Sequence, residues 1–136
     1  MKKVLSICLT VFLMVSISSC SFTTANITDL KMASTVQDNL PVDITNVFTT
    51  TSPVIYATGT LKNAPDGTVL TAEWYYLDAS PEIFIDSATL QPTDVNTSFS
   101  FSLSIPDNGW PTGKYEVRFF IDESTTVSSK LSFTVQ

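Results

Sequence analysis

Hydrophobic and polar side chains alternate along most of the chain beyond residue 26, and this two-residue period indicates β-strands. The clearest case is residues 97–105 (TSFSFSLSI), where Phe99 and Phe101 share one face and serines occupy the other. No segment after residue 20 has convincing helical periodicity. The complete set of predicted strands is 27–33, 54–61, 68–77, 82–88, 97–105, 113–122 and 130–136.

These seven short strands, separated by turns rich in Pro, Asn and Asp, predict one all-β domain over residues 27–136. Antiparallel strands of this length and spacing are typical of a two-sheet sandwich. Trp74 falls on the third predicted strand, and we expect it to pack between the sheets with Phe101, Phe119 and Phe133. Deleting so large a buried side chain would remove much of the stability of the domain.

The segment GWPTGKYEVRFFID, residues 109–122, is similar to the W-P-x-G-x-Y-x-V stretch of bacterial immunoglobulin-like and fibronectin-III-like exported domains. Tyr115, at the start of the sixth strand, resembles a tyrosine corner, and immunoglobulin-like domains often bury a Trp on the third strand. The resemblance implies a single antiparallel immunoglobulin-like β-sandwich. It departs from antibody domains because the inter-sheet cystine is absent, and it implies little about activity.

The N-terminus has the pattern of an export signal. Residues 1–3 are Met-Lys-Lys, and residues 4–17 form an uncharged, nearly continuous apolar run. As a helix this run would span roughly 21 Å, which is short of the ~30 Å hydrocarbon core of a bilayer. A signal peptide is therefore favoured over a permanent membrane span. The motif Ile17-Ser18-Ser19-Cys20 that follows resembles a bacterial lipobox.

The lipobox resemblance implies that residues 1–19 are removed and that Cys20 becomes a lipidated N-terminus with more than one acyl chain. Two or more acyl chains hold a protein stably on a membrane. Residues 20–26 would then form a short tether with a reach of at most about 25 Å. The alternative is an ordinary secretory signal, cut further on near Ala25, which would release a soluble exported protein.

Composition narrows the possible chemistry. Removal of both N-terminal lysines with the signal leaves five basic against thirteen acidic side chains, a formal charge of −8. Nucleic-acid binding rests on clustered Lys and Arg, so no nucleic-acid partner is expected. The chain has no histidine, and its two cysteines, Cys8 and Cys20, both lie in the first twenty residues. We therefore expect no thiolate metal site, no disulfide within the domain and no cofactor.

Carboxylates are the remaining candidates for catalysis or metal binding, but their spacing matches no hydrolase signature. The candidates are Asp78, Glu82, Asp86 and the pair Asp122-Glu123. A catalytic serine would need a lysine as its base, and no motif places a lysine beside one. Asp107 and Asp122 lie in predicted loops, which leaves a weak calcium site open, although Asp107-Asn108-Gly109 is first of all a turn signal. We predict a non-catalytic protein and assign no metal ligand.

An aromatic surface is the main candidate for binding. If the strand order is immunoglobulin-like, the third, fourth, sixth and seventh predicted strands form one sheet. Alternation then places Tyr75, Phe84 and Phe120 on its outer face beside Arg118, and the three aromatic side chains would form an apolar patch there. The same alternation turns inward Trp74, Tyr76, Ile83, Ile85, Tyr115, Val117, Phe119, Leu131 and Phe133. The alternative is that a loop, or residues 36–51, covers the aromatic side chains.

Together these patterns predict a lipidated, non-catalytic binding or structural module of the bacterial cell envelope. Its lipid would hold it on the cell membrane or outer membrane, with the domain outside the cytoplasm. The partner would be an envelope protein or glycan. Two alternatives stay open: a soluble secreted carbohydrate-binding module that stacks aromatic side chains on sugars, and an envelope hydrolase that uses paired carboxylates.

Overall fold

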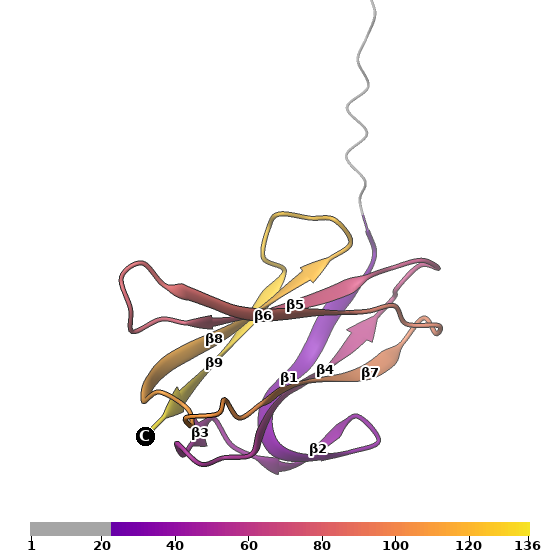
Figure 1. The fold of residues 1–136 in the computed structure, drawn as a ribbon. Coiled ribbons are helices and arrows are strands. Elements are labelled where there is room, and N and C mark those ends of the chain that lie inside the picture. The colour runs from indigo at the N-terminus through magenta and orange to yellow at the C-terminus, as the bar shows by residue number, and fades with distance from the viewer. Residues whose placement is uncertain (1–22) are drawn as a thin grey trace, which may run out of the picture.

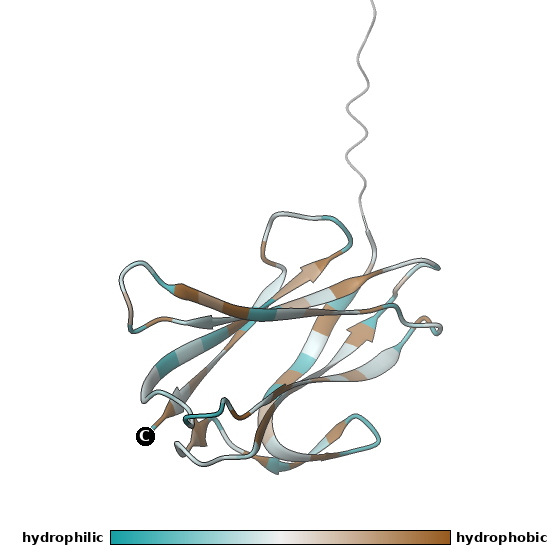
Figure 2. Ribbon diagram, in the orientation of Figure 1, coloured by the Kyte–Doolittle hydropathy of each residue, from teal (hydrophilic) through white to brown (hydrophobic). Residues whose placement is uncertain are grey.

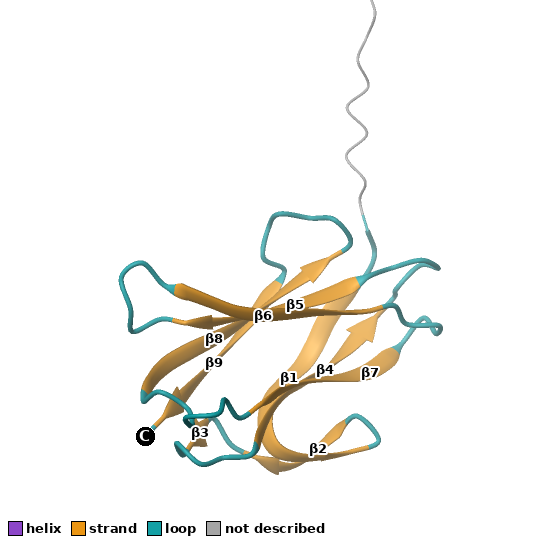
Figure 3. Ribbon diagram, in the orientation of Figure 1, coloured by secondary structure: helices purple, strands orange, loops and turns teal. Residues whose placement is uncertain are grey.

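The computed structural model describes residues 23–136, and all regular structure in this part of the chain is β-strand (Figure 3). These residues form nine strands: β1 (Asn26–Gln37), β2 (Leu40–Ile44), β3 (Val47–Phe48), β4 (Val54–Lys62), β5 (Leu70–Tyr76), β6 (Ile83–Leu90), β7 (Thr97–Ser104), β8 (Gly113–Ile121) and β9 (Ser129–Val135). The predicted signal peptide and lipobox lie outside the described residues. Over residues 23–136, no helix of a length and apolarity that would cross a bilayer is present.

The strands form two sheets (Figure 1). One has four strands in the order β2-β1-β4-β7, and the other has five in the order β3-β9-β8-β5-β6. The paired strands are antiparallel, except that β3 runs parallel to β9. The third, fourth, sixth and seventh predicted strands correspond to β5, β6, β8 and β9, and they share one sheet as the sequence predicted.

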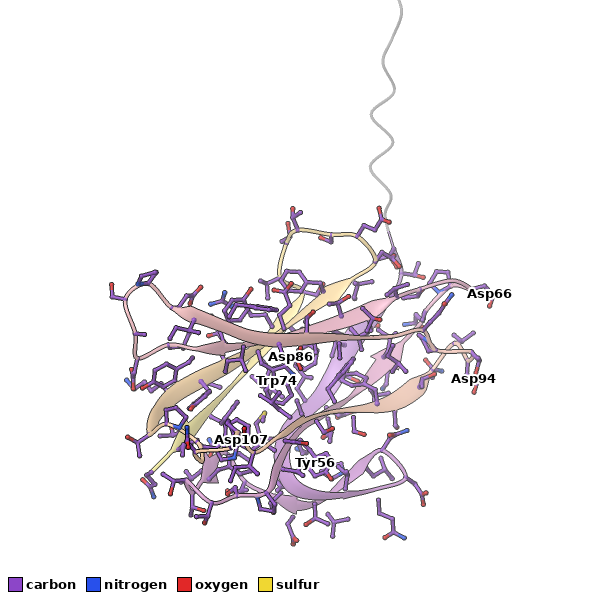
Figure 4. All side chains as sticks on the ribbon, in the orientation of Figure 1. Tyr56, Asp66, Trp74, Asp86, Asp94 and Asp107 are labelled. Atoms are coloured by element: carbon purple, nitrogen blue, oxygen red, sulfur yellow. The ribbon has the colours of Figure 1, made fainter. Side chains whose placement is uncertain are left out.

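The core is built by alternate residues of the central strands (Figure 2). Trp74, labelled in Figure 4, is 2% exposed. Its ring stands edge-on to Phe133 with the centroids 6.0 Å apart. Phe101 and Phe119 pack together at a centroid distance of 6.2 Å. All four side chains belong to the same buried cluster, which confirms the predicted burial of Trp74.

Two strands in residues 36–51 were not predicted, so the expected number of seven strands is wrong for the described residues. β1 and β2 form a hairpin whose turn residues, Asp38 and Asn39, have positive φ angles of 51° and 62°. The side chain of Ser100 on β7 donates a hydrogen bond of 2.8 Å to Asn39 Oδ1, which fixes the tip of this hairpin against the four-stranded sheet. β3 contributes only two residues and extends the other sheet beside β9.

Ile83 pairs with the core-packed Tyr76, but it is not buried in the core, because its side chain is 51% exposed. β6 is an edge strand, and most of its residues are exposed. A bulge at Ile85 shifts its register, so that Trp74 pairs with Asp86 and Tyr75 pairs with Phe84. Ile85 still packs against the core, whereas Ile83 lies nearer the end of this edge strand and stays uncovered.

The start of the described chain and the β8–β9 loop lie at one end of the domain, and the C-terminus lies toward the other (Figure 1). Thr23 borders a hollow together with residues 121–124 and Ser128, which confirms that this loop is next to the start of the described chain. β1 begins at Asn26, inside the segment that was predicted to be a tether. The proposed lipid attachment point therefore lies only six residues before the first strand.

Candidate functional site

Three of the predicted surface residues meet on the outer face of the five-stranded sheet. Tyr75 on β5 and Phe84 on β6 are register partners, and their rings stand edge-on with the centroids 5.6 Å apart. Arg118 on β8 places its Cζ atom 4.0 Å from the centroid of the Tyr75 ring, which is cation–π geometry. Phe84 is 53% exposed, so this aromatic–arginine cluster presents a large apolar side chain to solvent.

Two carboxylates hold the guanidinium of Arg118 in place. Its Nη1 and Nη2 atoms donate hydrogen bonds of 2.9 and 2.8 Å to Glu82, and its Nε donates one of 2.6 Å to Glu116. These hydrogen bonds raise the pKa of Arg118, and the bond from Arg118 lowers the pKa of the Glu82 carboxyl. Charge-assisted pairs of this bidentate kind fix geometry well. The guanidinium is therefore positioned over Tyr75 by the protein itself.

The hydroxyl of Tyr75 also makes a hydrogen bond. It donates a hydrogen bond of 2.6 Å to Oε2 of Glu73 on the same strand. This hydrogen bond, with a smaller effect of burial, raises the pKa of Tyr75. Lys130 on β9 places its Nζ atom 4.0 Å from Oε2 of Glu116, which continues the network to the next strand. The cluster is thus preorganised by contacts from four strands and from Glu82, just before β6.

Phe120, the fourth predicted residue, lies next to the cluster. It follows Arg118 by two residues on β8 and is half-buried on the same face. Tyr75 and Phe120 border a groove of about 450 Å³, to which Glu73 contributes from β5 and Asp122 and Glu123 from the β8–β9 loop. The loop therefore forms one border of the face but leaves Phe84 exposed. Residues 36–51 extend the two sheets as β2 and β3, beside β1 and β9.

Four of the five carboxylates considered for catalysis have separate hydrogen-bond partners. The backbone N–H groups of Lys114, Ser87 and Val69 donate hydrogen bonds to Asp78, Asp86 and Asp122 at 2.9, 2.8 and 3.1 Å. Glu82 is paired with Arg118. Asp78 thereby joins the loop after β5 to β8, Asp122 joins the β8–β9 loop to the residue before β5, and Glu82 joins the start of β6 to β8.

The two loops considered for calcium lie at opposite ends of β8. Asp107, labelled in Figure 4, precedes this strand. Asp122 follows it directly. A nine-residue strand spans roughly 27 Å, so the two carboxylates cannot share an ion. In the part of the chain that the structure describes, no group of three or more His, Cys, Asp or Glu side chains is arranged to hold a metal.

Glu116 and the β8–β9 loop were not identified from the sequence as parts of this face. Glu116 lies two residues before Arg118 on the same strand, so alternation alone could have placed it beside the guanidinium. The loop carries no such signal, because its position over β5 depends on the tertiary fold.

Comparison with known proteins assigns the chain to no family. No protein-family model matches the chain. No curated protein matches it either. Among solved structures the chain is similar to a β-glucosidase from Kluyveromyces marxianus, with a TM-score of 0.47 and 17% sequence identity. The match covers 85% of this chain and 15% of that one, so the chain spans a small part of the enzyme.

Proposed function

We propose that this protein is a lipid-anchored, non-catalytic binding module of the bacterial cell envelope, which binds a protein partner through its aromatic–arginine cluster. The observation that carries the proposal is the preorganised contact of Tyr75, Phe84 and Arg118 on an exposed sheet face. Aromatic side chains and arginine dominate the binding energy of many protein interfaces. Side chains that are already held in place lose little conformational entropy when a partner binds.

A protein suits this face better than a glycan. Sugars bind aromatic platforms by stacking on an open ring face, but the guanidinium of Arg118 already covers one face of the Tyr75 ring. Phe84 is the exposed ring of the cluster, and it stands at the edge strand of the sheet. An exposed aromatic anchor surrounded by charged side chains is typical of a protein-binding surface.

An immunoglobulin-like topology is the finer part of the proposal. The order β1-β4-β7 opposite β9-β8-β5-β6 corresponds to strands A-B-E opposite G-F-C-C′ of that fold. The hydroxyl of Tyr115 donates a hydrogen bond of 2.6 Å to the carbonyl of Pro111, as a tyrosine corner does. Burial raises the pKa of this hydroxyl to about 12. Trp74 is buried on β5, the strand that corresponds to C.

Lipid attachment at Cys20 can be tested directly. We expect labelled fatty acid to be incorporated into the wild-type protein and not into Cys20→Ala, and the wild type to sediment with membranes. Cys8→Ala is the matched control, because this cysteine lies in the apolar run of the predicted signal peptide and should not affect labelling. Equal labelling of wild type and Cys20→Ala, or intact protein only in the culture fluid, would contradict the anchor.

Binding through the cluster is tested by photo-crosslinking in cells. A photoreactive amino acid at Phe84 should give a discrete adduct with one envelope protein, whereas the same group at the exposed Ser102, on the other sheet, should not. Because Phe84 is 53% exposed, Phe84→Ser should change the free energy of unfolding by no more than about 1 kcal/mol. It should nevertheless weaken capture of the identified partner. Unchanged capture by Phe84→Ser would refute the assignment of this face.

A further inference from the structure

The groove beside the aromatic–arginine cluster carries negative charge that the described residues do not neutralise. Glu73, Asp122 and Glu123 line it. All ion pairs within 4.0 Å among residues 23–136 involve Glu82 or Glu116, so these three carboxylates have no Lys or Arg partner there. Glu73 accepts the Tyr75 hydroxyl and Asp122 accepts the Val69 amide, each through one oxygen. Their other carboxylate oxygens are available to a ligand.

Aromatic rings border the same groove, and this combination distinguishes it from an ordinary acidic surface. Tyr75 and Phe120 lie on neighbouring strands and both border it. Aromatic rings attract organic cations through their negative faces, and because Arg118 already occupies one face of Tyr75, Phe120 is the ring assigned to this contact. Carboxylates accept short charge-assisted hydrogen bonds from ammonium and guanidinium groups. A long side chain with an apolar stem and a cationic tip satisfies both kinds of group at once.

We propose that this groove receives a lysine or arginine side chain of the protein partner. This inference rests on the proposed function, because the groove shares Tyr75 with the cluster that is assigned to partner binding. The volume of about 450 Å³ accommodates one such side chain. Residues 23–136 carry five basic and thirteen acidic side chains, so the long-range field of the domain also attracts a basic partner.

The first experiment titrates short cationic peptides into the full mature chain. The probes are acetylated and amidated Gly-Lys-Gly and Gly-Arg-Gly, and Gly-Gln-Gly is the uncharged control. The protein is held in zwitterionic micelles, and its backbone amides are followed by NMR. With the cationic peptides only, we expect saturable chemical-shift changes confined to residues 71–75 and 120–125. The affinity for these peptides should fall as the salt concentration is raised. Absence of these localised shifts would overturn the proposal.

Two double variants distinguish peptide binding in the groove from attraction by the net charge of the domain. Glu73→Gln with Glu123→Gln removes two charges from the groove, and we expect about tenfold weaker peptide binding, or ~1.4 kcal/mol. Asp66→Asn with Asp94→Asn removes the same charge from two other loops, the β4–β5 and β6–β7 connections (Figure 4). This control should keep the affinity within about twofold, since neither Asp66 nor Asp94 lines the groove. Equal weakening in both double variants would show attraction by net charge alone and would refute the groove.

The two proposals can fail separately. Unlabelled Cys20, or unchanged partner capture by Phe84→Ser, would refute the lipid anchor or the cluster without affecting the peptide titration. If the cluster captures a partner but the peptides produce no shifts at residues 71–75 and 120–125, the proposed function stands and the groove does not receive a basic side chain.

Discussion

Gly59 illustrates how a single residue is constrained by packing in this domain. It lies on β4 directly opposite Phe99 of β7. A Cβ atom at this position would lie 2.6 Å from Cζ of Phe99 and 2.9 Å from Cδ2 of Leu30. Phe99 is fully buried and also packs against Phe101 and Phe119, so its ring has little room to move. The absence of a side chain at Gly59 is therefore required by the ring opposite.

The substitution Gly59→Ala tests this contact. We expect the free energy of unfolding, measured by urea denaturation, to fall by about 1–3 kcal/mol, as for other overpacked cores. Ser102→Ala is a suitable control on the neighbouring strand, because Ser102 is exposed and should change stability by no more than about 0.5 kcal/mol. A Gly59→Ala protein as stable as the wild type would mean that Phe99 does not pack over β4 as described.

The side of the strand on which each residue of the candidate face lies was predictable, but the side chains that it contacts were not all predictable. Alternation placed Tyr75 and Arg118 on one outer face, because the side of a strand is decided by odd or even position alone. The contact of Arg118 with Glu82 depends on how the chain turns before β6 and on the bulge at Ile85. Neither the turn nor the bulge has a local sequence signal, since bulges depend on packing across the sheet.

At the scale of strands, the bridge between Arg118 and Glu82 ties the start of β6 to β8 across the intervening β5. The pKa of Glu82 is lowered from its ordinary value of 4.5, mainly because the carboxylate accepts hydrogen bonds from Arg118. A carboxyl whose pKa is lower in the folded state stabilises the fold above its ordinary pKa. That contribution is lost as the pH falls through the lowered value.

We therefore expect Glu82→Gln to melt at a lower temperature than the wild type at pH 7, and this difference to vanish at pH values well below 4.5. Thermal melting followed by circular dichroism at a series of pH values measures it. Asp66→Asn is the control, because among the described residues Asp66 makes no ion pair. A difference between Glu82→Gln and wild type that stays constant across this pH range would show that the bridge does not stabilise β6.

The strands that were predicted and those that were missed differ for physical reasons. Strands such as β7 and β8 turn alternate apolar residues into the core and mostly polar residues outward, so a two-residue period marks them. β2 also alternates, but Leu40, Val42 and Ile44 are 55%, 55% and 60% exposed, so its apolar residues do not mark a core face. Pro41, the second residue of β2, is of a type that sheets accept at their edges, which is where β2 lies. β3 is too short to have a period.

At the scale of the whole molecule, the groove could not be predicted. The sequence identified Asp122 and Glu123 as available carboxylates but offered catalysis or metal binding as their roles. The folded chain brings both next to Glu73 and Tyr75, which lie about fifty residues earlier in the sequence. Only the return of β8 alongside β5 creates this combination of carboxylates and rings.

The position of β1 also has a mechanical consequence. β1 starts at Asn26, the last residue of the predicted tether, and pairs with β4 through six residue pairs, from Asn26–Lys62 to Ala33–Tyr56. A pulling force between a lipid on Cys20 and a partner on the five-stranded sheet would enter the domain along this strand. The hydrogen bonds of the ladder would then share the load in shear instead of opening one after another. Under tension the domain would act as a stiff link, and detachment of β1 from β4 would be its point of failure.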